Sequence, residues 1–104
     1  MTTAKTITKA RLTPAQIELI QEKITFYFGP HSLVWLFGSR ADPTRRGGDV
    51  DLYIEPTHED TLIPKLRCKI ALEDALDLSV DLVVKEQGKD DPIYHLAKTN
   101  GIRL

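Results

Sequence analysis

Several features that would define a protein class are scarce or missing in this 104-residue chain. Cys68 is the only cysteine, which excludes an internal disulfide. Acidic and basic residues nearly balance, with a formal net charge of −1, so no general attraction to nucleic acid or to a membrane surface is expected. No apolar run approaches the length of a membrane span, and the N-terminus has no apolar signal segment. These absences predict a cytoplasmic protein without membrane contact and without direct nucleic-acid binding.

The apolar content of the chain is that of an ordinary folded domain. Hydrophobic residues make up 41% of the sequence, which predicts a packed core rather than disorder. The length suits one domain. We expect a flexible, polar tail over residues 1–12 and a single domain over residues 13–104.

Helical and strand patterns alternate along that domain. Thr13-Pro14-Ala15-Gln16 combines an N-cap, a first-turn proline and a capping-box glutamine, which predicts a helix that runs to about Tyr27. Period-2 and period-3.6 patterns predict the later elements. These are strands over 32–37, 49–55 and 78–84, a short helix at 38–41, a helix over 62–76, and a last helix from Pro92 that Gly101 ends. The order predicts an α/β (α+β) fold in which helices pack against a small mixed sheet.

The helix over 62–76 carries both apolar and basic residues. Ile63, Leu66 and Ile70, with Ala71 or Ala75, recur at helical spacing, so we expect them to face the core. Its basic residues would then form the solvated face: Lys65, Arg67 and Lys69.

The most informative stretch is residues 36–55, LFGSRADPTRRGGDVDLYIE. Asp49 and Asp51 stand at i and i+2 at the head of a strand, so their side chains share one face. Two neighbouring carboxylates raise each other's pKa unless a cation lies between them. The Gly38-Ser39 turn offers backbone N–H groups and a hydroxyl to phosphate oxygens. This combination predicts a site for a metal-bound nucleoside triphosphate.

A third carboxylate, Asp81, lies inside an otherwise apolar strand. An ionised aspartate there is costly unless it has a partner. Placed beside the Asp49–Asp51 strand, it would complete a three-carboxylate site suited to Mg²⁺, with two ions as in two-metal transfer chemistry. The alternative is that Asp81 pairs with a lysine such as Lys85.

These residues resemble the signature of the DNA polymerase β-type nucleotidyltransferase superfamily. More narrowly, FGSRADPTRRGGDVDLYIE is similar to the minimal nucleotidyltransferases that are paired with HEPN-domain partners. The resemblance covers roughly residues 13 to 104. Nine residues separate Ser39 from Asp49, one fewer than in the common family pattern. The resemblance implies a polymerase β-like nucleotidyltransferase fold and Mg²⁺-dependent transfer of a nucleoside monophosphate to a hydroxyl.

The resemblance also implies roles for individual residues. Gly38 and Ser39 would bind the β- and γ-phosphates of ATP or another triphosphate. Asp49 and Asp51 would ligate both metal ions, and Asp81 would ligate the catalytic ion and act as general base. Independently of the resemblance, Arg40 suits either neutralisation of the leaving pyrophosphate or a place in a solvated loop. The neighbouring Arg45 and Arg46 are expected to be solvated loop residues.

Three functions fit this site. Family members that act as antitoxins transfer AMP to a tyrosine of an all-helical HEPN toxin, which is the leading hypothesis. The alternatives are a non-catalytic antitoxin that only binds its partner, and a stand-alone transferase acting on RNA or a small molecule. The small size leads us to expect that a partner chain, or a second copy, completes the site. No residues mark a base pocket, so the sequence does not predict the nucleotide.

Overall fold

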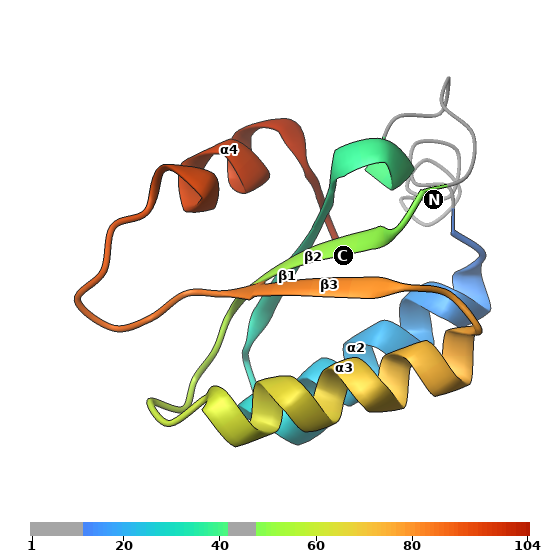
Figure 1. Ribbon diagram of the computed structural model, residues 1–104, viewed down its shortest axis with the longest axis horizontal. Helices are drawn as coiled ribbons and strands as arrows, with labels where there is room; N and C mark the ends of the chain where they lie inside the picture. The colour runs from blue at the N-terminus through green and yellow to red at the C-terminus, as the bar shows by residue number, and fades with distance from the viewer. Residues whose placement is uncertain (1–11, 42–47) are drawn as a thin grey trace.

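Helices and strands alternate along the chain much as the sequence pattern predicts (Figure 1). The computed structural model describes residues 12–41 and 48–104. Most of the expected tail, residues 1–11, lies outside them, whereas Leu12 is 4% exposed and packs in the core. The elements are helices α2 (Pro14–Phe28), α3 (Leu62–Leu76) and α4 (Pro92–Asn100), the 3₁₀ helix η1 (Gly38–Ala41), and strands β1 (Leu33–Phe37), β2 (Val50–Glu55), β3 (Val80–Val84) and β4 (Ile102–Arg103).

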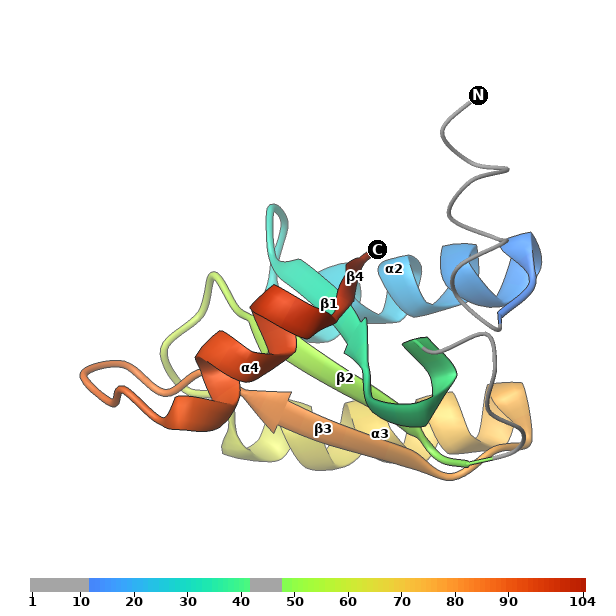
Figure 2. The ribbon, with the colours of Figure 1, turned by 90° about the horizontal axis from the view of Figure 1, so that it is seen from above.

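The strands form one mixed sheet in the order β3-β2-β1-β4. Strand β1 is antiparallel to β2 and β4, whereas β2 and β3 are parallel. Helices α2 and α3 lie side by side on one face, and α4 lies on the other (Figures 1 and 2). This arrangement confirms the expected mixed sheet with packed helices. The two-residue strand β4 was not expected, because it is too short to show a periodic pattern.

The start of α2 has the capping box that its sequence predicts. Thr13 Oγ1 accepts a hydrogen bond from the Gln16 backbone N–H at 3.2 Å, and Gln16 Oε1 accepts one from the Thr13 N–H at 2.9 Å. Two N–H groups that the first turn leaves unpaired are thereby satisfied. The buried residues of α2 follow at helical spacing: Ile17, Ile20, Ile24 and Phe28.

The alternation along β2 builds a core on each side of the sheet. Val50, Leu52 and Ile54 are fully buried in the larger core. On the opposite face Tyr53 is also fully buried, because α4 covers it. Its ring lies 5.5 Å from that of Trp35 and 5.4 Å from that of Tyr94. Helix α4 thus covers one end of the face that carries Asp51.

The predicted buried face of α3 is wrong. Cys68 and Leu72 are fully buried and Leu76 is 8% exposed, whereas Ile63, Leu66 and Ile70 are between 51% and 68% exposed. Both sets recur at helical spacing, so periodicity alone does not choose between them. The packing of α3 against both α2 and the sheet selects the set that contains Cys68. This burial raises the pKa of the Cys68 thiol to about 12.

Within the described ranges 12–41 and 48–104, no helix has both the length and the apolar character needed to cross a membrane.

Candidate active site

Asp51 and Asp81 are cross-strand neighbours. The parallel register of β2 and β3 pairs Asp51 with Asp81, so both side chains project from the same sheet face. The pKa of Asp51 is raised by burial first and then by the negative charges of Asp81 and Asp49. Burial and neighbouring carboxylates both disfavour the charged form of Asp51, and a cation bound between the carboxylates would relieve this repulsion.

Asp49 is the third carboxylate near this pair. It is exposed and directly precedes β2, and its negative charge acts on Asp51. Over the ranges that the structure describes, no three His, Cys, Asp or Glu side chains stand close enough together to hold a metal ion as they are. The structure therefore brings Asp51 and Asp81 together directly, with Asp49 at their margin. Neighbouring carboxylate oxygens are a donor set that fits a hard cation such as Mg²⁺.

The raised pKa of Asp51 predicts an unusual pH dependence of stability. The folded chain binds a proton at Asp51 more readily than the unfolded chain does, so this group's contribution to the free energy of unfolding falls as pH rises above about 3.9. We expect Asp51→Asn to be more stable than the wild type at about pH 7, by less than about 1 kcal/mol because solvent screens this half-buried group. Urea unfolding should show that this gain shrinks toward about pH 4. A gain that grows on acidification would contradict the assignment.

Gly38 begins η1 and approaches Asp51 closely. Its φ is +73°, a left-handed backbone conformation that favours glycine. A Cβ at this position would overlap Asp51 Oδ2 and lie 3.2 Å from Asp51 Cγ. Both the conformation and the space at this position therefore favour glycine. The backbone of the Gly38-Ser39 turn lies beside the carboxylates, as a phosphate-binding turn would.

Arg40 connects η1 to the start of β2. Its Nε donates a hydrogen bond to the Gly48 carbonyl oxygen at 3.3 Å, one residue before Asp49. The guanidinium thus lies near the turn and the carboxylates. Arg45 and Arg46, expected to be solvated, lie outside the described residues.

Lys69 of α3 supplies a contact that the sequence did not indicate. Its Nζ lies 3.8 Å from Asp81 Oδ1 and 3.1 Å from Glu73 Oε2, and it also donates to the Val80 carbonyl. Asp81 therefore does contact a lysine, but the partner is Lys69 rather than Lys85. The expectation that Lys69 belongs to a merely solvated face is wrong, because the packing of α3 brings it to the edge of the sheet.

Lys69 and Glu73 together clamp the outer edge of β3. Glu73 Oε2 accepts a hydrogen bond from the Val80 N–H at 3.0 Å, and this bond, followed by the one from Lys69, lowers the pKa of Glu73. Strand β3 is at the edge of the sheet, so its outward backbone groups would otherwise lack strand partners. The clamp fixes the strand that carries Asp81.

The Lys69 ammonium also affects cation binding. A divalent ion held by Asp81 has to displace this positive charge, so we expect Lys69→Gln to bind Mn²⁺ roughly 5-fold more tightly, the effect of one exposed ion pair. Glutamine keeps a donor for the Val80 carbonyl. The free Mn²⁺ signal in electron paramagnetic resonance measures the affinity, with Lys65→Gln as the control one turn away. Unchanged or weaker binding would show that Lys69 does not oppose the cation.

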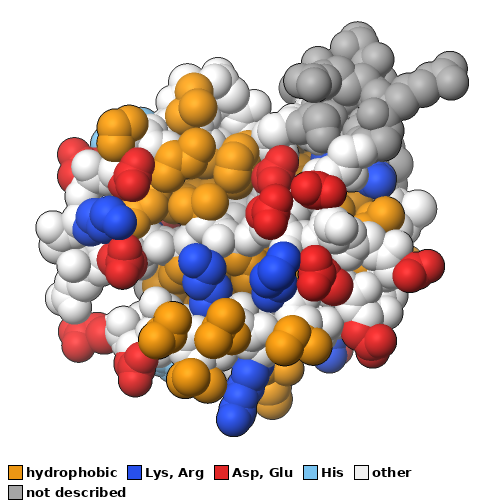
Figure 3. All heavy atoms as spheres, viewed as in Figure 1, with side chains coloured by type: hydrophobic (Ala, Val, Ile, Leu, Met, Phe, Trp, Pro, Cys, Tyr) orange, Lys and Arg blue, Asp and Glu red, His pale blue; other side chains and the backbone are white. Residues whose placement is uncertain are grey.

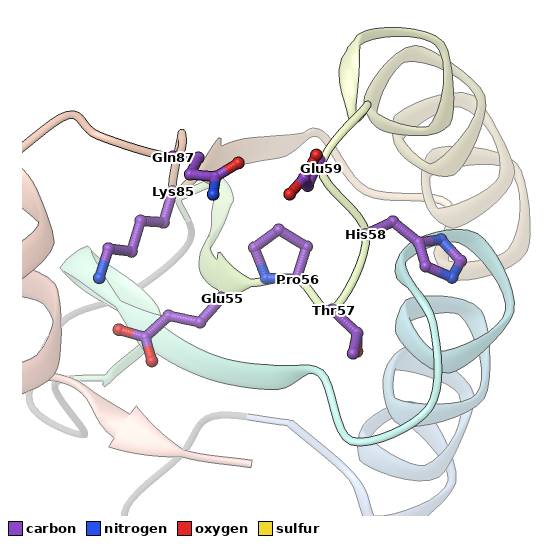
Figure 4. A pocket seen from close by; sticks show the side chains of 7 residues that line it. All are labelled: Glu55, Pro56, Thr57, His58, Glu59, Lys85 and Gln87. Atoms are coloured by element: carbon purple, nitrogen blue, oxygen red, sulfur yellow. The ribbon is translucent and has the colours of Figure 1, made fainter.

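Two cavities lie toward the other end of the sheet. One of about 410 Å³ is lined by Glu55, Pro56, Thr57, His58, Glu59, Lys85 and Gln87, and in Figure 4 the His58 ring turns away from it. The other, of about 240 Å³, lies beside α4. Neither is lined by Asp51 or Asp81.

Tyr53 and Glu55 next to these cavities have structural partners. The Tyr53 hydroxyl donates to Glu55 Oε2 at 2.9 Å, and Lys98 Nζ lies 3.1 Å from the same oxygen. Burial alone would raise the pKa of Glu55, but these two contacts outweigh it and lower the pKa. Tyr53 and Glu55 are therefore engaged with one another and with Lys98, away from the Asp51–Asp81 pair.

Comparison with known proteins agrees with this geometry. The sequence matches the family model described as "Polymerase beta, Nucleotidyltransferase" over residues 22–104, while no curated protein matches. A solved minimal nucleotidyltransferase is 26% identical, with 86% of this chain and 90% of that chain covered and a TM-score of 0.65. A chain in a toxin–antitoxin structure with AMP-PNP is 26% identical. The match covers 83% of this chain and 70% of that chain, with a TM-score of 0.62. A chain in the structure of a tri-AMPylated Shewanella oneidensis HEPN toxin in complex with MNT antitoxin is 24% identical. The match covers 83% of this chain and 69% of that chain, with a TM-score of 0.56. Because the family model spans most of the chain, this protein belongs to the polymerase β nucleotidyltransferase family.

Proposed function

We propose that this chain is a Mg²⁺-dependent transferase that moves AMP from ATP to a hydroxyl. Family membership supports a nucleotidyl transfer. The observation that carries the proposal is the Asp51–Asp81 pair next to the Gly38 turn. A carboxylate pair beside a turn of backbone N–H groups can hold a metal-bound triphosphate at both its metal and its phosphate oxygens.

The residues would divide the chemistry as follows. Asp49, Asp51 and Asp81 would hold two Mg²⁺ ions, which would supply positive charge to offset the negative charge of the triphosphate. Gly38 and Ser39 contact the β- and γ-phosphates.

The transfer itself is a displacement at the α-phosphorus. Asp81 accepts the proton of the acceptor hydroxyl as its oxygen forms a bond to the α-phosphorus. The bond to the bridging oxygen breaks, and pyrophosphate leaves with the electron pair, its charge offset in part by Arg40.

We further propose that the acceptor is a tyrosine of a HEPN-domain toxin encoded beside this protein, and that the chain acts as a cytoplasmic antitoxin. One similar structure is a complex of an MNT antitoxin with a tri-AMPylated HEPN toxin, and another toxin–antitoxin structure contains AMP-PNP. The presence of Asp49, Asp51, Asp81 and the Gly38-Ser39 turn favours transfer over a purely binding antitoxin. A stand-alone transferase acting on RNA or a small molecule is the remaining candidate.

The position of a radioactive label tests the type of transfer. With ATP labelled at the α-phosphate, we expect label in the toxin; with ATP labelled at the γ-phosphate, we expect label only in pyrophosphate. Label that reaches the toxin from the γ-phosphate would indicate a kinase instead. Label in added RNA but not in the toxin would favour the stand-alone transferase.

A further inference from the structure

Helix α3 exposes four large aliphatic side chains along the first part of its length. Leu62 is 67%, Ile63 52%, Leu66 51% and Ile70 68% exposed. At 3.6 residues per turn these positions fall within one arc of the helix, so they form a continuous stripe, which we call the α3 patch. Figure 3 shows hydrophobic side chains in a row over α3, with Lys and Arg side chains next to them. Stable monomers rarely leave such an apolar face uncovered unless it binds something.

The α3 patch is flanked by positive charge. Lys65, Arg67 and Lys69 lie in the same part of the helix, and its first acidic residue is Glu73. Helical geometry places Lys65 and Lys69 along one flank of the stripe and Arg67 along the other. Lys69 reaches the edge of the sheet, where it contacts Asp81. The surface is thus an apolar stripe with Arg67 on one flank and, on the other, Lys65 and the Lys69 ammonium that is already paired with Glu73 and Asp81.

This pattern decides among the possible occupants. In a two-fold dimer centred on Leu66, the three cations of one copy would meet the same three cations of the other. The chain's own first eleven residues carry Lys5, Lys9 and Arg11 and no acid, so they do not complement the flanks either. An anionic membrane would attract the basic residues but repel Glu73 and Asp74, which follow on the same helix.

We propose that the α3 patch is the docking surface for an acidic amphipathic helix of the toxin. Such a helix would place apolar residues at i, i+3 or i+4, and i+7 on the stripe, with Asp or Glu side chains against the basic flanks. The inference rests on the proposed function, because it takes the partner to be the all-helical HEPN protein. One flank of the α3 patch reaches the carboxylates through Lys69, whose Nζ lies 3.8 Å from Asp81 Oδ1, so a helix bound here would lie near the edge of the sheet that carries Asp81.

Isothermal titration calorimetry of the purified toxin against variants of this chain tests the surface. Leu66→Asp and Ile70→Asp each place a carboxylate in the middle of the stripe and are expected to weaken the complex about 100-fold, as loss of an interface anchor does. Leu96→Asp is the matched control, because Leu96 on α4 is 53% exposed; its affinity should stay within about twofold of the wild type. Arg67→Glu, which leaves the stripe intact, should weaken binding about 10-fold at low salt and less at high salt.

Each result decides the proposal. Wild-type affinity in Leu66→Asp and Arg67→Glu would overturn it, as would equal losses in Leu96→Asp. Binding to phosphatidylcholine–phosphatidylserine vesicles without a toxin complex would overturn it in favour of a membrane. A missing wild-type complex with intact Mg²⁺–ATP binding would remove the docking surface and leave the transfer chemistry standing. A patch-dependent complex that never becomes nucleotidylated would confirm the surface and contradict the proposed function.

Discussion

The Asp51→Asn variant is expected to lose Mg²⁺–ATP binding and to lower nucleotide transfer by roughly 10³-fold. The negative charges of Asp81 and Asp49 both act on Asp51, so Asp51 interacts with both of the other carboxylates. Its loss should therefore weaken metal binding the most. Asparagine has nearly the same shape but one neutral oxygen donor in place of an anionic oxygen. Calorimetric titration with Mg²⁺–ATP measures the loss, and the midpoint of thermal unfolding shows whether the fold is intact.

Asp90→Asn is the matched control for this substitution. Asp90 is an exposed acid that pairs with His95 at 2.9 Å, and it lies in the segment between β3 and α4 rather than on the strand that carries Asp81. The control should bind Mg²⁺–ATP like the wild type. Equal affinities in the two variants would mean that the Asp51–Asp81 pair is a structural feature and not the metal site.

Gly38→Ala is expected to reduce transfer by roughly 10²-fold, the effect of about a 1 Å displacement of a catalytic group. The new methyl group would overlap Asp51 Oδ2, so the carboxylate has to move from its place beside Asp81. The methyl group would also crowd the backbone that we assign to the phosphates. The measurement is the transfer rate at saturating Mg²⁺–ATP, together with the Mn²⁺ affinity of the free protein.

Gly88→Ala separates this steric effect from backbone strain. Gly88 has a φ of +78°, close to the +73° of Gly38, but a Cβ there would meet no atom within 4 Å. Both variants should therefore lose about 1 kcal/mol of stability. Only Gly38→Ala should lose activity. If both variants transfer nucleotide at the wild-type rate, the turn does not shape the site.

Local signals in the sequence predicted much of the fold. The capping box of Thr13 and Gln16 marks the start of α2, and the alternation along β2 separates Val50, Leu52 and Ile54 from Asp51 and Tyr53. The register that pairs Asp51 with Asp81 follows from the same alternation once the two strands lie side by side. The capping box and the alternation depend on residues a few positions apart, and for that reason the sequence alone reveals them, whereas the pairing of Asp51 with Asp81 also needs β2 and β3 to be neighbours.

The features that the sequence did not predict depend on tertiary packing. Helix α3 carries two stripes at helical spacing, and only contact with α2 and the sheet decides that Cys68 and Leu72 are buried while Leu66 is exposed. The same choice brings Lys69 to Asp81, twelve positions along the chain. The contact could have been suspected from a lysine one turn before Glu73 on a helix that precedes an edge strand. That Lys69 rather than Lys85 pairs with Asp81 could not be predicted, because Lys85 lies nearer to Asp81 in sequence.

The most direct test of the central claim is the intact mass of the proposed HEPN-domain partner after incubation with this protein, Mg²⁺ and ATP. We expect mass additions in AMP-sized steps with the wild type and none with Asp49→Ala, which removes a carboxylate from the proposed metal site but lies outside the sheet. An unchanged toxin mass, in a mixture in which the two proteins form a stable complex, would contradict nucleotide transfer and indicate an antitoxin that acts by binding alone.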